Sequence, residues 1–136
     1  MRRAVTRPIG VPFSDDSIKV VSLRWTEAGG AFIDVLSKRS GRICTVTFEH
    51  VAGLRLLDEL DLASVWMDVE KADLRSTWLF RVDEGGWYEL ESTRSDFYTQ
   101  HESPRPVEFL VAGYRECVSI LSLAEPVVHE PETRTA

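Results

Sequence analysis

The segment RICTVTFE, residues 42–49, decides the fold of this chain. Apolar and polar side chains alternate strictly along it: Cys44, Val46 and Phe48 against Thr45, Thr47 and Glu49. Strict alternation of β-branched and aromatic residues with polar ones is typical of a strand that buries one face. We therefore expect a β-rich fold built around this strand.

Two more strands are predicted before it, over residues 17–25 and 31–37, and the first is expected to be covered on both faces. Short reversals containing glycine, at residues 27–30 and 38–42, separate the three segments. Strands joined so closely form an antiparallel meander. Residues 52–59 are predicted to continue as a strand, although their leucine spacing also fits a helix.

A helix is predicted over residues 60–75, because four apolar side chains recur there at three- and four-residue spacing: Leu62, Val65, Trp66 and Val69. Strands are expected at residues 76–82, 107–112 and 117–122, with a helix over 114–121 as an alternative. Residues 87–91 fit either a helical turn or a short strand.

These elements predict an α+β, β-rich fold class, an antiparallel meander sheet packed against one or two short helices. Residues 13–123 should form a single globular domain of ordinary size. Residues 1–12 are expected to be a flexible leader or an edge segment, and residues 124–136 a flexible tail, because both contain prolines and lack periodicity.

The net charge of −6 is unevenly distributed. Residues 58–91 carry three basic residues against ten acidic ones. Such an acidic block repels nucleic acid and anionic lipid and attracts a basic partner. The other interpretation is a face that only keeps the protein soluble.

The sequence predicts no catalytic, metal or cofactor site and no membrane span. The three histidines lack the spacing of zinc ligands, and no apolar run approaches the roughly 20 residues of a membrane helix. Cys44 and Cys117 are expected to be buried free thiols in a cytoplasmic protein. A disulfide between them would need their Cα atoms within about 7 Å.

Three stretches resemble the small bacterial immunity proteins of polymorphic or contact-dependent toxin systems. They are FSDDSI at residues 13–18, RLLDE at residues 55–59 leading into Asp61 and Leu62, and FLVAGYRECV at residues 109–118. The resemblance implies a stoichiometric inhibitor that binds and occludes a cognate basic toxin domain, with no enzymatic activity of its own.

The predicted partner-binding site joins acidic residues, for electrostatic capture, to aromatic anchors. Its members are Asp58, Glu59, Asp61, Asp83, Glu84, Trp87, Tyr88 and Tyr98. The alternative is a small-ligand-binding β domain or weak hydrolase with a cleft lined by Trp87, Tyr98 and His101, under a loop at residues 92–106. A homodimer that uses this aromatic loop as its interface is a third arrangement.

Overall fold

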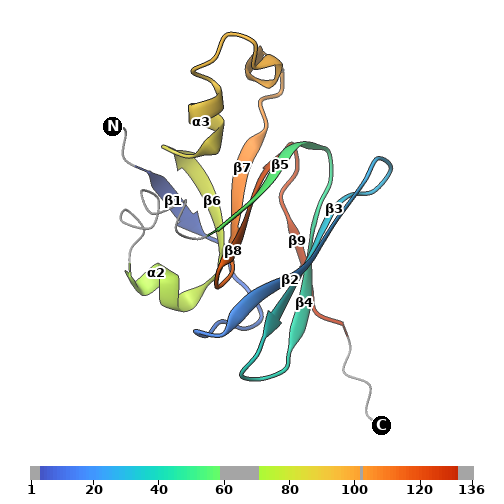
Figure 1. Ribbon diagram of the computed structural model, residues 1–136, viewed down its shortest axis with the longest axis vertical. Helices are drawn as coiled ribbons and strands as arrows, with labels where there is room; N and C mark the ends of the chain where they lie inside the picture. Colours follow the sequence, from blue (N-terminus) through green and yellow to red (C-terminus); the bar gives the residue numbers. More distant parts are fainter. Residues whose placement is uncertain (1–3, 59–70, 102, 132–136) are drawn as a thin grey trace.

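Two antiparallel sheets face each other in the computed structural model, which describes residues 4–58, 71–101 and 103–131 (Figure 1). The large sheet has the order β1 (Val5–Pro8), β6 (Leu79–Glu84), β7 (Val107–Ala112), β8 (Glu116–Ser122) and β5 (Val51–Asp58). The small sheet has the order β2 (Ile18–Thr26), β3 (Gly30–Ser37), β4 (Ile43–Phe48) and β9 (Val127–His129). The described helices are short: α2 (Lys71–Ser76), α3 (Trp87–Glu91) and the 3-10 helix η2 (Tyr98–His101). The predicted fold class is confirmed.

The main core lies between the two sheets and follows from the alternation along β3 and β4. Every second side chain of these strands points inward, and Val46 and Phe48 are fully buried. They meet apolar side chains from β6, β7 and β8 of the large sheet in one cluster. The rings of Phe48 and Phe109 lie 5.5 Å apart and join the two layers.

The central strands β7 and β8 are buried on both faces. Phe80, Leu110 and Cys117 form a second cluster on the face of the large sheet that points away from the small sheet. Burial on both faces explains the nearly continuous apolar run of β8, which is a strand and not the alternative helix. Cys44 and Cys117 are both free and buried, as predicted, and they belong to different clusters.

A two-stranded ribbon passes from one sheet to the other. β4 continues into β5 through Glu49 and His50, and β8 is followed by β9. Ser122 Oγ donates a 2.7 Å hydrogen bond to the carbonyl of Glu49, and Leu123 N donates one of 3.3 Å to the carbonyl of His50. After this corner β5 pairs with β8 alone among the described strands, so β5 is an edge of the large sheet.

Both segments that were expected to be flexible ends contain a strand. β1 pairs with β6, and β9 pairs with β4. The edge segment that the sequence left open for residues 1–12 agrees with β1. The prediction missed β9 because an edge strand is held by backbone hydrogen bonds and needs no apolar periodicity. An edge also tolerates the missing N–H of Pro8. Arg42 adds a 2.7 Å ion pair to Glu130, just beyond β9.

The predicted helix over residues 60–75 falls mostly outside the described residues. Its last part agrees with α2, which ends at Ser76. Residues 87–91 are helical, which decides between the two alternatives left open by the sequence. No helix in the described ranges has the length and apolar character needed to cross a membrane.

Candidate functional site

The acidic residues that were predicted to form one partner surface lie far apart in the large sheet. Asp58 ends β5, whereas Asp83 and Glu84 end β6. β7 and β8 separate these two strands, and the antiparallel order makes β5 and β6 run in opposite directions. Asp58 therefore lies at one end of the sheet and the other two at the opposite end. Glu59 and Asp61 lie outside the described residues.

Asp83 is engaged by two arginines of its own chain. Its carboxylate accepts hydrogen bonds from Arg7 Nε at 2.6 Å and from Arg81 Nε at 2.9 Å. The bond from Arg7 is the main cause that lowers the pKa of Asp83. This negative charge is locally balanced, and Asp83 joins β1 to β6 through Arg7.

Trp87 and Tyr88 form the first turn of α3, and Glu108 of β7 holds that turn. The buried Glu108 carboxylate accepts hydrogen bonds from the backbone N–H groups of Trp87 at 3.0 Å and Tyr88 at 2.7 Å. Burial raises the pKa of Glu108, and the two backbone hydrogen bonds oppose that change. Tyr88 packs edge-on against Phe97, with ring centroids 5.8 Å apart.

Of the three predicted aromatic anchors, Tyr98 alone is strongly exposed, at 76%. Tyr88 is buried and belongs to a small cluster with Phe97 and Leu121, and Trp87 packs against that cluster. Phe97, from the segment after α3, packs against Tyr88 and buries it, so the ring of Tyr88 is not presented at the surface. The sequence alone does not show which aromatic side chains of a loop turn inward.

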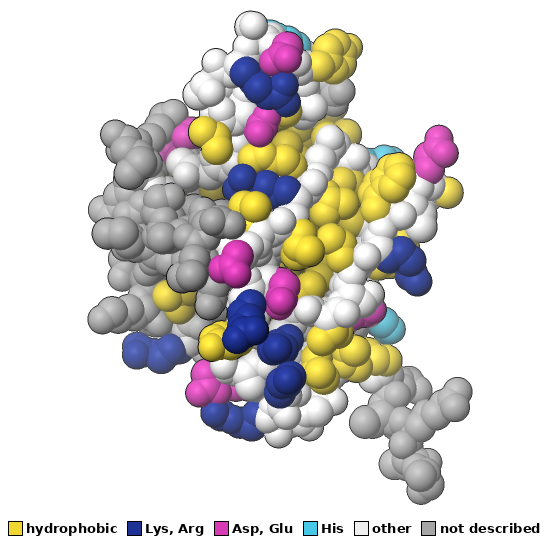
Figure 2. Space-filling model, viewed as in Figure 1, with side chains coloured by type: hydrophobic (Ala, Val, Ile, Leu, Met, Phe, Trp, Pro, Cys, Tyr) yellow, Lys and Arg dark blue, Asp and Glu magenta, His cyan; other side chains and the backbone are white. Residues whose placement is uncertain are grey.

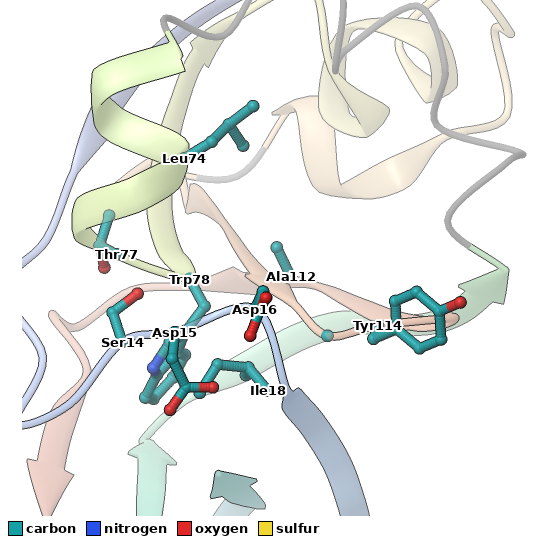
Figure 3. A pocket seen from close by; sticks show the side chains of 10 residues that line it. Ser14, Asp15, Asp16, Ile18, Leu74, Thr77, Trp78, Ala112 and Tyr114 are labelled. Carbon is teal, nitrogen blue, oxygen red and sulfur yellow. The ribbon is translucent and has the colours of Figure 1, made fainter. Parts of the chain in front are cut away.

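A cavity of about 280 Å³ opens between the start of β2, α2 and the turn from β7 to β8 (Figure 3). Three of its polar side chains are engaged by other residues of the chain. Asp15 accepts hydrogen bonds from the hydroxyl groups of Ser17 and, at 2.5 Å, Ser37. Asp16 pairs with Arg39, and Trp78 Nε1 donates a 2.8 Å hydrogen bond to the carbonyl of Phe13.

A second cavity of about 280 Å³ lies beside the end of β6 and the start of β7. Arg105 covers the ring of Tyr88 there, at 4.1 Å from the ring centroid. Neither cavity is lined by Trp87, Tyr98 or His101, the residues of the predicted ligand cleft. In the part of the chain that the structure describes, no group of three His, Cys, Asp or Glu side chains is arranged to hold a metal ion.

The most distinctive surface is an apolar seam between the two edge strands β2 and β5. We define the seam by five side chains: Val21, Leu23, Trp25, Leu54 and Leu56. Leu23 and Leu54 pack against the main core, whereas Val21, Trp25 and Leu56 are 48%, 57% and 53% exposed. Figure 2 shows hydrophobic side chains in a diagonal band between β5 and β2.

Trp25 and Leu56, the two most exposed side chains of the seam, lie on the core-facing side of their strands. Trp25 is opposite the fully buried Ala31, and Leu56 is opposite the fully buried Val118. Residues paired across neighbouring strands share one face of a sheet. Trp25 and Leu56 thus point to the interior side, but each belongs to an edge strand where the opposite sheet does not cover it.

Each edge strand is interrupted by one bulge and is otherwise regular. The bulge of β2 is at Val21, where the register with β3 shifts. The bulge of β5 is at Ala52, where the register with β8 shifts. Bulges and charges are common ways of protecting an edge against further pairing. From Gly53 to Asp58 the ladder of β5 is uninterrupted, so this stretch keeps a regular row of backbone groups on its outer side.

The prediction that the strand over residues 17–25 is covered on both faces was wrong for its second half. From Ser22 to Thr26, β2 is exposed at every position except Leu23. An alternating strand has the same local sequence at an edge as in the middle of a sheet. The position of β2 depends on pairings that are distant in sequence, so no local signal could have located the seam.

Comparison of the chain with protein-family models, with curated proteins and with solved structures found no match.

Proposed function

We propose that this protein binds another protein through the seam and acts by occluding that partner, as a stoichiometric inhibitor of the immunity-protein type. The observation that carries the proposal is the exposure of Trp25 and Leu56 on the core-facing side of two edge strands. Contiguous exposed apolar side chains mark interaction surfaces in soluble proteins. Tryptophan is also among the residues that contribute most to binding free energy at interfaces.

Other features of the chain agree with a binding role. Asp15, Asp16 and Trp78, which line the first cavity, are engaged in hydrogen bonds or ion pairs within the chain. The two buried free thiols fit a reducing compartment. The resemblance to immunity proteins is the reason for proposing an inhibitor. The seam is proposed as its contact surface in place of the predicted acidic surface.

The proposal is tested by co-expression with the protein encoded by the adjacent gene, followed by co-purification and an assay of the partner's toxicity. Trp25→Ser and Leu56→Ser, singly and together, should weaken the complex and remove protection. Val127→Ser is the matched control, because Val127 is 64% exposed on β9, the other edge of the small sheet. Unchanged binding by the double variant would overturn the seam as the contact surface.

A further inference from the structure

Arg55 lies on β5 between Leu54 and Leu56 and points to the opposite face of the strand. Its register partner is Ser119, which lies on the outer face of the large sheet with Leu110. The guanidinium stacks over the ring of Trp87, 5.0 Å from the centroid. Arg55 Nε is buried and has no hydrogen-bond partner among the described residues.

An unused buried donor on an arginine is costly, because the group has lost water without gaining a protein acceptor. Burial lowers the pKa of Arg55, while the carboxylates of Glu108 and Glu91 raise it, although neither accepts a hydrogen bond from Arg55 Nε. A carboxylate placed beside Arg55 would satisfy the donor and form a charge-assisted bond. The site therefore favours an acidic group from outside.

The outer side of β5 determines where such a group would come from. A strand added beside β5 places alternate side chains on opposite faces. One set would lie beside Leu54 and Leu56 in the seam, and the other set would lie beside Arg55. The edge from Gly53 to Asp58 is regular enough to pair with such a strand.

We propose that the partner contributes an extended segment in which apolar residues alternate with an acidic residue, and that this segment pairs with β5 as a further strand. Its apolar side chains enter the seam, and its carboxylate faces Arg55. This inference rests on the proposed function and specifies the partner's chemistry.

The test uses synthetic peptides of about eight residues, a common strand length, in which valine alternates with glutamate. Binding to the full chain is measured by calorimetry. Two further peptides carry N-methyl groups on the amides of alternate residues, one on the odd and one on the even positions. Each N-methyl set removes the donors on one edge of the peptide strand.

Strand pairing predicts that one N-methylated peptide binds like the parent and that the other loses binding by at least about tenfold, the effect of losing roughly 1.4 kcal/mol of hydrogen bonding. Equal affinities for the two peptides would overturn the pairing. A peptide with glutamine in place of glutamate should bind about tenfold more weakly, since bonds to charged groups are the stronger ones. Equal affinity of the glutamine peptide would overturn the role of the carboxylate.

Arg55→Met should abolish the preference for glutamate over glutamine. Arg94→Met is the matched control, because Arg94 also stacks on an aromatic ring, that of Phe97 at 5.4 Å, but lies after α3. Absence of binding by the parent peptide up to about 1 mM would overturn this inference. The proposed function would then still be decided separately by the Trp25 and Leu56 variants with the whole partner.

Discussion

Glu108 accepts a 2.7 Å hydrogen bond from the backbone N–H of Tyr88, so a buried strand residue holds the start of a helix twenty positions earlier in the chain. The other carboxylate oxygen accepts from Trp87 N at 3.0 Å. α3 has no side-chain cap of its own. The position of Trp87 under Arg55 thus depends on Glu108.

Glu108→Gln should lower the free energy of unfolding by about 1–3 kcal/mol. An amide can accept only one of the two bonds through oxygen, and its nitrogen would face a second N–H donor. Urea denaturation followed by tryptophan fluorescence measures the loss. Glu49→Gln, at an exposed position, is the control and should change stability by less than about 0.5 kcal/mol. Equal effects of the two substitutions would contradict the role of Glu108.

Alanine substitutions at Gly30 and Gly41 should differ in their cost to stability. Both have positive φ, 85° and 74°, but a Cβ at Gly30 would lie 2.0 Å from the carbonyl oxygen of Phe48, whereas one at Gly41 meets nothing within 4 Å. Gly41→Ala should cost about 1 kcal/mol, from backbone conformation alone. Gly30→Ala should cost at least about 3 kcal/mol, because β3 and β4 must also move apart. Thermal unfolding of the two variants tests this order.

Asp83 predicts a pH-dependent contribution to stability. Its pKa is lowered in the folded protein, mainly by the hydrogen bond from Arg7. The stabilisation is therefore fully present above the ordinary carboxyl pKa and is lost as pH falls through the lower, folded value. Asp83→Asn should destabilise the protein by about 1 kcal/mol or less at neutral pH, since Arg7 is largely exposed. The difference from wild type should shrink on acidification, and a constant difference would contradict the ion pair.

The thiol of Cys44 should be unreactive while the protein is folded. It is fully buried, and burial raises its pKa to about 12. The thiolate is the reactive species, so little of it forms at mildly alkaline pH. Labelling of Cys44 in a Cys117→Ser variant by a thiol reagent should follow the rate of global unfolding in urea. Fast labelling without denaturant would show that the main core opens locally at β4.

The strands of the core could be predicted from sequence because their pattern is local. Cys44, Val46 and Phe48, which alternate with polar residues in the sequence, form the buried face of β4. The sequence could not show that β7 and β8 lie between β5 and β6. This strand order separates Asp58 from Asp83. Strand order depends on pairing between distant segments, and an acidic block in sequence need not be an acidic surface.

The same physical reason explains why Trp25 was missed as a candidate contact residue. Its alternation with Leu23 fits a buried strand, and only the position of β2 at the edge leaves it exposed. Tyr88 is the converse case. It lies beside acidic residues in the sequence, but the loop carrying Phe97 returns over it.

The most direct test of the seam as the contact surface is amide hydrogen exchange of this protein with and without its co-purified partner. The account predicts slower exchange on binding at residues 21–25 of β2 and 53–57 of β5, with no change in β9. Protection confined to Asp83, Glu84 and the segment around Tyr98 would contradict it and restore the acidic, aromatic surface as the site of binding.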